Sequence, residues 1–273
     1  VQTCALPIWS DPMGYARAYY AALPKVAIGQ WPPVLYVGLG AWMVVFGVGT
    51  ASAVSFICAV AAGLLALVHR AARDLGVGAV APLALLVSLP LVQRLSGMVM
   101  TELPLALLCT GAVLAGARLL ERGDLRSGIA FGAWSTAAIL TKGNALALAA
   151  VPALGVLLAR RLDLLRTRAF WTPALLVVLL CGPWYALTTG YQASSWDGGA
   201  SPHWGYTRAA TPIYLSGLVQ DLGGAGVAVL ALAGLLLPAR EGNPARAFRA
   251  ASGAFVLGLL ALLVILQIGR AHV

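Results

Sequence analysis

Four charged residues stand out because each lies beside a long apolar run. Lys142 sits within "LTKGNALAL", Arg94 and Glu102 flank "QRLSGMVMTELP", and Asp11 belongs to "SDPMGY". A carboxylate of this kind can take a proton from a hydroxyl group. A lysine or arginine cation can bind an anionic group, and phosphate is the obvious one in a lipid setting. The residue types therefore suit a reaction on a phosphate-bearing substrate, provided that the fold gathers them.

Lys142 has a second interpretation that the sequence leaves open. A charge at the centre of a membrane span costs about 3 kcal/mol, and the cost is smaller near the boundary. Lys142 could therefore be a boundary residue whose ammonium group snorkels to the interface. The alternative is a cation that faces the phosphate of a lipid-borne substrate.

The composition predicts which elements carry these residues. Hydrophobic residues make up 60% of the 273 residues and charged residues only 10%, and the mean hydropathy is +0.88. A soluble domain carries about 25% charged residues. The apolar runs do not alternate and are too long for barrel strands. We therefore predict an all-α, polytopic transmembrane helical bundle. The net charge of +9 is explained by basic cytoplasmic loops, so no nucleic-acid partner is expected.

Eight apolar segments are candidate membrane spans, with boundaries that can move by several residues. They cover residues 51–69, 76–93, 103–120, 127–141, 144–160, 170–189, 213–237 and 247–267. Their polar breaks are alternately rich and poor in basic residues. The rich breaks hold Arg70, Arg73, Arg118, Arg122, Arg126, Arg160, Arg161, Arg166, Arg168, Arg240, Arg246 and Arg249. The poor breaks hold Arg17, Lys25, Arg94, Lys142 and Arg208. The positive-inside rule places the rich breaks in the cytoplasm.

The apolar segment 32–47 does not fit this alternation as a span. It is shorter than the ~20 residues that a span needs, and a span here would move the break around Arg70 to the outside. We predict instead a helix that lies in the outer interface and begins near Pro32 and Pro33. With this topology Asp11, Arg94, Glu102 and Lys142 all lie at the outer surface, although they come from different hairpins. Asp221 falls inside an apolar run, about two turns from its outer end.

Other polar and aromatic residues receive structural interpretations. The acidic residues Asp74, Glu121, Asp124, Asp163 and Glu241 lie beside arginines and are predicted to be solvated loop charges. Trp184 and Tyr185 are predicted to belong to an interfacial aromatic belt. Three cysteines in apolar spans are predicted to be small buried hydrophobes, and these are Cys58, Cys109 and Cys181.

The two ends of the chain share an unusual origin. The DNA string ACGTGTGCTCTTCCGATC encodes residues 3–8 when read forwards. Its reverse complement, shifted by one base, encodes residues 268–273. This string resembles a common sequencing adapter. We therefore expect residues 1–8 and 268–273 to be translated adapter, and residues 9–267 to be one transmembrane catalytic domain truncated at both ends.

Five motifs in order carry a resemblance to a known family. These are "SDPMGY", "WPPVLYVGLGAWMVVFG", "MTELPLALL", "LTKGNALALAAVPAL" and "GPWYALTTG". Together they resemble glycosyltransferase family 39 of the GT-C superfamily. That group includes protein O-mannosyltransferases, the bacterial aminoarabinose transferase and RgtA-type lipopolysaccharide glycosyltransferases.

The resemblance implies an integral membrane glycosyltransferase of the cell envelope. Such an enzyme transfers a hexose or pentose from a polyprenyl-phosphate donor to a lipid, glycan or protein acceptor. It implies a bacterial inner membrane location with the active site facing the periplasm. Transfer in a single displacement would invert the anomeric centre.

The same resemblance assigns roles to individual residues. Asp11 and Tyr15 match an acidic pair followed by tyrosine, although Pro12 replaces the second acid. Asp11 is then the first choice as catalytic base and Glu102 the second. Lys142, with Arg94, compensates charge on the leaving phosphate. Tyr15 is a substrate-binding residue, as is Trp31, which stands before the double proline where relatives often carry lysine. A divalent ion could share the task, but the incomplete acidic pair predicts no metal site.

Two rival functions remain. A transporter or permease would carry ionisable or glycine-interrupted positions near the midplane and an internal repeat. Asp221, followed by "GGAG", is the one hint of this, and no repeat is seen. A non-catalytic membrane scaffold would leave the convergence of Asp11, Arg94, Glu102 and Lys142 unexplained.

Overall fold

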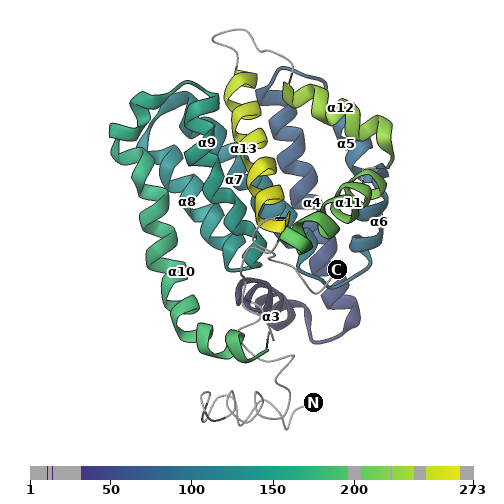
Figure 1. Ribbon diagram of the computed structural model, residues 1–273. Helices are drawn as coiled ribbons and strands as arrows, with labels where there is room; N and C mark the ends of the chain where they lie inside the picture. Colours follow the sequence, from purple (N-terminus) through teal and green to yellow (C-terminus); the bar gives the residue numbers. More distant parts are fainter. Residues whose placement is uncertain are drawn as a thin grey trace.

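The fold is a bundle of α-helices (Figure 1). The computed structural model describes residues 11, 14, 32–195, 204–221, 223–236 and 244–264. Within these ranges all regular structure is helical and no strand occurs. The prediction of an all-α membrane bundle is therefore confirmed.

The helices follow one another with short connections. In chain order they are α3 (Val34–Phe46), α4 (Thr50–Asp74), α5 (Val80–Ser88), α6 (Pro90–Ser96), α7 (Glu102–Arg122), α8 (Leu125–Ile139), the 3-10 helix η2 (Gly143–Ala149), α9 (Ala150–Leu158), the 3-10 helix η3 (Leu162–Arg166), α10 (Arg168–Ser195), α11 (Trp204–Asp221), α12 (Ala225–Leu236) and α13 (Pro244–Val264).

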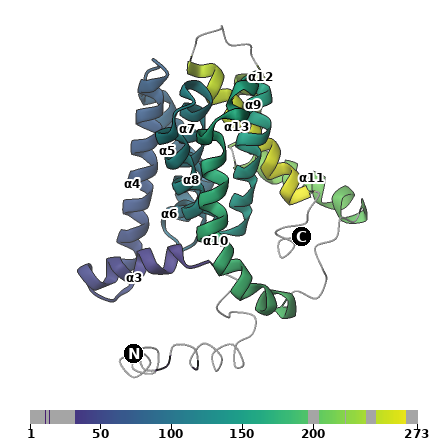
Figure 2. The same ribbon diagram turned by 90° about the vertical axis from the view of Figure 1, so that its left-hand side faces the viewer.

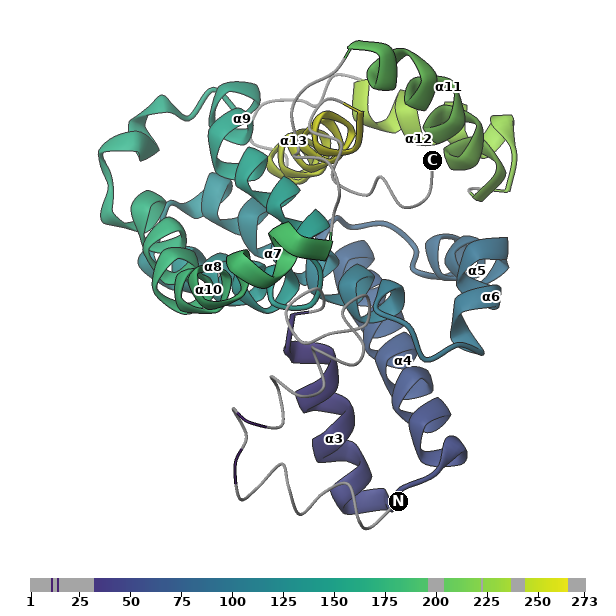
Figure 3. The same ribbon diagram turned by 60° about the horizontal axis from the view of Figure 1, so that its bottom comes forward.

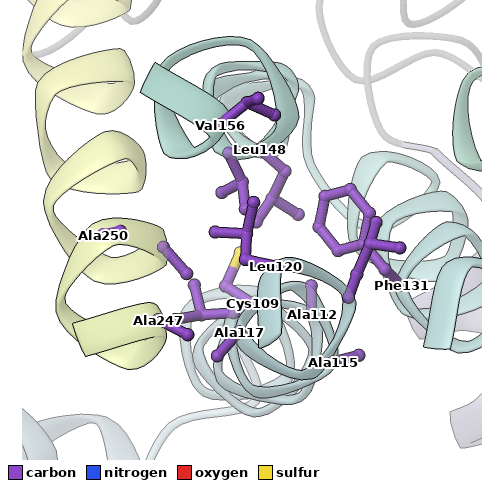
Figure 4. Close-up of a cluster of buried hydrophobic side chains, with 14 of the residues drawn as sticks. Cys109, Ala112, Ala115, Ala117, Leu120, Phe131, Leu148, Val156, Ala247 and Ala250 are labelled. Carbon is purple, nitrogen blue, oxygen red and sulfur yellow. The ribbon is translucent and has the colours of Figure 1, made fainter. Parts of the chain in front are cut away.

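Helix α7 forms the centre of the bundle. In its most apolar 18-residue window, 67% of the residues are buried, against 17–22% for the other three long helices. Its side chains meet those of α8, α9 and α13, and Figure 4 shows Leu120 close to Leu148 and Val156. The view in Figure 3 shows α4 on another side of α7. The residues of α7 are thus held from several directions.

Small residues allow these helices to approach closely. A Cβ atom added to Gly111 would lie 2.6 Å from the Trp134 ring, and one added to Gly116 would lie 2.8 Å from Val151. Without a hydrophobic force between helices in lipid, association depends on such close packing of small residues. The glycine and alanine content of α7 therefore explains its central place.

The contact of α8 with α10 gives a testable prediction. A Cβ atom added to Gly128 would lie 2.4 Å from the backbone oxygen of Ala169. Gly128→Ala should lower the free energy of unfolding by about 1–3 kcal/mol because backbone must move to accommodate it. Gly253→Ala is the control, since a Cβ atom there has no neighbour within 4 Å. Equal unfolding midpoints in mixed micelles for both variants would contradict this packing.

Within the described ranges, four helices are long and apolar enough to cross a membrane. They are Thr50–Asp74, Glu102–Arg122, Arg168–Thr188 and Ala245–Leu263. They correspond to four of the eight predicted spans, and the other four predicted spans are formed by shorter helices. The fold class is thus as predicted, but half of the predicted spans are formed by helices shorter than a typical membrane span.

Two of the predicted spans are interrupted, each for a local reason. The span 76–93 is divided into α5 and α6 at Leu89, which is extended (φ −62°, ψ 125°) before Pro90. Proline disfavours the helical conformation in the residue before it. The span 213–237 is divided into α11 and α12, and Gly223 and Gly224 have positive φ between them. Glycine adopts that conformation without a Cβ penalty.

Helix α3 runs across one end of the bundle. Figure 2 shows it nearly perpendicular to α4, as the predicted interfacial helix would be. Leu35 is buried, whereas Val37 and Val44 are exposed. The backbone N–H of Val34 donates to the carbonyl of Leu140 at 2.9 Å. This bond fixes the start of α3 beside the end of α8.

The arginine-rich breaks meet at the opposite end of the bundle. Arg118 of α7 pairs with Asp74 of α4 at 2.8 Å. Arg161 pairs with Asp163 at 3.0 Å and donates to the carbonyls of Leu120 and Glu121. A hydrogen bond from Arg161 lowers the pKa of the Asp163 carboxyl group. Asp74 and Asp163 are thus paired, and their side chains are 52% and 63% exposed, which agrees with the predicted solvated loop charges.

The three cysteines of the apolar spans differ in their burial. Cys109 and Cys181 are buried, as predicted, but Cys58 is exposed, so the prediction for it was wrong. Cys58 lies on α4, of which only 22% of the apolar window is buried. An apolar residue on such a helix meets lipid as readily as it meets protein.

Candidate active site

Glu102 and Lys142 form an ion pair at the end of the bundle that carries α3. Glu102 is the first residue of α7, and Lys142 lies between α8 and η2. The ammonium Nζ of Lys142 donates to Oε1 of Glu102 at 2.8 Å. The hydroxyl of Thr101 donates to Oε2 of the same carboxylate at 3.3 Å. The fold thus joins two of the sequence-predicted site residues that are 40 positions apart.

The conformation of the chain explains why Lys142 faces this carboxylate. Lys142 is extended (φ −159°, ψ 136°), so it interrupts the helical path between α8 and η2. Thr141 is completely buried, and its hydroxyl donates to the carbonyl of Ala137 at 2.8 Å. Thr141 therefore anchors the end of α8, and the next side chain leaves the helix.

Tyr185 supports the same turn from α10. Its hydroxyl donates to the carbonyl of Ile139 at 3.2 Å, and a Cβ atom on Gly143 would lie 3.8 Å from that hydroxyl. Tyr185 also packs against the buried hydrophobic cluster that α7, α8, α9 and α13 form around the centre of the bundle. The sequence predicts that Tyr185 belongs to an interfacial aromatic belt, and the structure adds its contacts with α8 and with the core. A residue at a span end can belong to an aromatic belt or to a contact between helices. For Tyr185, the packing of α10 on α8 shows the contact between helices.

The pair is accessible to a ligand. The side chain of Lys142 is 19% exposed and that of Glu102 is 30% exposed. Their attraction is therefore only partly screened by solvent, and the ammonium group can still meet an incoming anion. A lysine has three N–H donors, so one cation can bind a carboxylate and a phosphate together.

The other predicted residues are not all placed beside this pair. Arg94 is exposed on α6, the helix that precedes Glu102. Asp11 is also exposed, and its Oδ1 accepts the backbone N–H of Gly14 at 2.8 Å. This hydrogen bond of Asp11 is local, because its partner Gly14 is only three residues further along the chain.

Several predictions fall outside the described residues. Tyr15 and Trp31 do so, as do the ends 1–8 and 268–273 that resemble adapter. For metals, the part of the chain that the structure describes contains no group of three histidine, cysteine, aspartate or glutamate residues that could hold an ion.

The fold and the pair define an integral membrane protein with a charged site at one end of its helices. Residues 30–186 match the family model described as Dolichyl-phosphate-mannose-protein mannosyltransferase. The match covers more than half of the chain, so the chain belongs to this family. No significant match is found among curated proteins or among solved structures.

The family match confirms the resemblance to GT-C glycosyltransferases. The protein is a membrane glycosyltransferase of the GT-C kind, which favours the enzyme over the transporter alternative. The matched residues include Trp31, Arg94, Glu102 and Lys142, whereas Asp11 lies before them.

Proposed function

We propose that the protein transfers a sugar from a polyprenyl-phosphate donor to a hydroxyl group of a lipid, glycan or protein acceptor. The reaction takes place at the end of the bundle that holds Glu102 and Lys142. This end faces the periplasm in a bacterial inner membrane. The ion pair carries the proposal, because it holds a solvent-accessible cation beside α3, the helix that we predict to lie in the outer interface, where a lipid phosphate could meet it.

The proposed reaction is a single displacement. Asp11 takes the proton of the acceptor hydroxyl while its oxygen attacks the anomeric carbon. The bond between that carbon and the phosphate oxygen breaks, and the electron pair leaves with the phosphate. Lys142 and Arg94 compensate the charge that builds there. Attack opposite the leaving group inverts the anomeric centre, and no general acid is needed because phosphate is a stable leaving group.

Glu102 has a different role from Asp11 in this scheme. Its two oxygens accept hydrogen bonds from Lys142 and Thr101. A carboxylate engaged in this way is a weaker proton acceptor than an exposed one. Glu102 therefore positions the lysine, and it remains the second choice as base. Tyr15 and Trp31 bind the donor or the acceptor in this proposal.

Sugar transfer in proteoliposomes tests the donor class. The purified protein should transfer radiolabelled sugar from a polyprenyl-phosphate donor to an acceptor extract. A nucleotide sugar should give no product, because it lacks the lipid carrier. Transfer from the nucleotide sugar, with none from the polyprenyl-phosphate sugar, would reject the proposed donor.

Cysteine labelling tests the orientation. Met98 lies shortly before Glu102 and is 46% exposed, and Leu162 lies at the opposite end and is 56% exposed. In a cysteine-free background, Met98→Cys should react with an impermeant maleimide in intact spheroplasts. Leu162→Cys is the matched position and should react only after permeabilisation. The reverse pattern would place the pair in the cytoplasm and remove the proposed periplasmic site.

A further inference from the structure

A cavity of about 490 Å³ lies at the arginine-rich end of the bundle. It is formed where the C-terminal ends of α4 and α7 meet the start of α8 and the first turns of α13. This is the upper end of the bundle in Figure 1. Four arginines line it, and they are Arg70, Arg118, Arg122 and Arg126. We call it the arginine cavity.

The charges of the arginine cavity suit a singly charged anion. Its three acidic residues are Asp74, Glu121 and Asp124. Four arginines and three carboxylates leave a net charge of +1. Asp74 is already engaged by Arg118 at 2.8 Å. A phosphodiester carries one negative charge and would bring the cavity to neutrality.

Asp124 is also engaged within the protein. Its Oδ1 accepts the backbone N–H of Ser127 at 2.6 Å, as the N-cap of α8. That hydrogen bond, with the charges of Arg122 and Arg126, lowers the pKa of the Asp124 carboxyl group. The Asp124 carboxylate is thus engaged in the helix cap. Among the residues that the structure describes, no ion pair involves the other three arginines of the cavity, Arg70, Arg122 and Arg126.

Apart from Ser127, the uncharged residues of the lining are apolar, and this points to a lipid. Leu114, Ala115 and Phe248 line the cavity together with the arginines. The cavity also lies at the ends of two helices long enough to cross a membrane, Thr50–Asp74 and Glu102–Arg122. A site that combines cations with apolar walls at this depth matches a headgroup and the first part of its acyl chains.

We propose that the arginine cavity binds the phosphodiester headgroup of an anionic membrane lipid in the leaflet at the arginine-rich end. The cavity is separate from the Glu102–Lys142 pair. Arg118 and Glu102 are sixteen residues apart on α7, which corresponds to about 24 Å along a helix. Binding here therefore does not depend on the proposed reaction and can be measured without it.

Binding of short-chain lipids to the whole protein in detergent tests this site. Native mass spectrometry should show tighter binding of dioctanoyl phosphatidylglycerol than of dioctanoyl phosphatidylcholine. Arg122→Gln combined with Arg126→Gln should weaken phosphatidylglycerol binding roughly 30-fold, since each juxtamembrane cation contributes about fivefold. Arg70→Gln, on a different helix, should weaken it roughly fivefold. This second variant keeps the test decisive if the double variant does not fold.

Matched controls separate the cavity from the general positive charge of this end. Arg166→Gln combined with Arg168→Gln removes two exposed arginines that do not line the cavity. This variant should bind phosphatidylglycerol within about twofold of the parent protein. An equal loss in the control and the cavity variants would overturn the proposal, as would equal binding of both lipids. Inorganic phosphate that displaces the lipid at comparable concentrations would overturn the assignment to a lipid headgroup.

Discussion

Asp11→Asn should lower the rate of sugar transfer by a factor of about 10²–10⁴, which is the usual contribution of a general base. Asparagine keeps a side-chain oxygen that can accept the backbone N–H of Gly14. The local turn should therefore survive, and the protein should elute and unfold as the parent protein does. The loss should appear in kcat, because the proton moves only during the chemical step.

The control for this variant is Asp163→Asn. Asp163 is an exposed aspartate that pairs with Arg161 at the opposite end of the bundle. This variant should retain transfer activity within about twofold, since surface ion pairs contribute little to stability. Normal activity in Asp11→Asn would reject Asp11 as the base and leave Glu102 as the candidate.

Lys142→Met should lower the rate of transfer by about 10²–10³, the effect of removing one group that stabilises developing charge. Methionine keeps the apolar stem but removes the ammonium group that contacts Glu102. If the ammonium also binds the ground-state phosphate, the KM for the donor should rise as well. An unchanged kcat and donor KM would return Lys142 to the interpretation of a snorkelling boundary residue.

Glu102→Gln separates the two roles proposed for that residue. Glutamine keeps an oxygen that can accept from Lys142, so a positioning role predicts a fall of about tenfold in kcat/KM, equivalent to about 1.4 kcal/mol. A base at Glu102 predicts a fall of 10²–10⁴ instead. A glutamate that positions lysine should also give no further loss when it is changed in a Lys142→Met background.

The class of the fold could be predicted because it depends on local properties. A chain that is 60% hydrophobic, with runs long enough to cross a membrane, has few alternatives to a helical bundle. The prediction of an interfacial helix over 32–47 rests on two further facts, the length of that segment and the distribution of arginines. Helix interruptions were harder, because Pro90 and the glycines near 223 act only within one turn of an otherwise apolar run.

The Glu102–Lys142 contact required the tertiary structure. The sequence predicted that both residues lie at one surface, since each follows or precedes a span at the same end. Their 2.8 Å contact depends on how closely α7 and α8 pack, and the small residues of α7 set that distance. The packing of α10 on α8 brings the Tyr185 hydroxyl to the carbonyl of Ile139, a contact that a position at a span end does not reveal.

From the sequence alone, the class of protein and the grouping of Glu102 and Lys142 at one end of the bundle could be predicted. These depend on composition and on the order of charges along the chain, which do not change on folding. The tertiary structure decided which charges pair and where a cavity remains between arginines from different helices. Such contacts depend on the rotation and separation of packed helices, and these are set by all the interfaces of the bundle together.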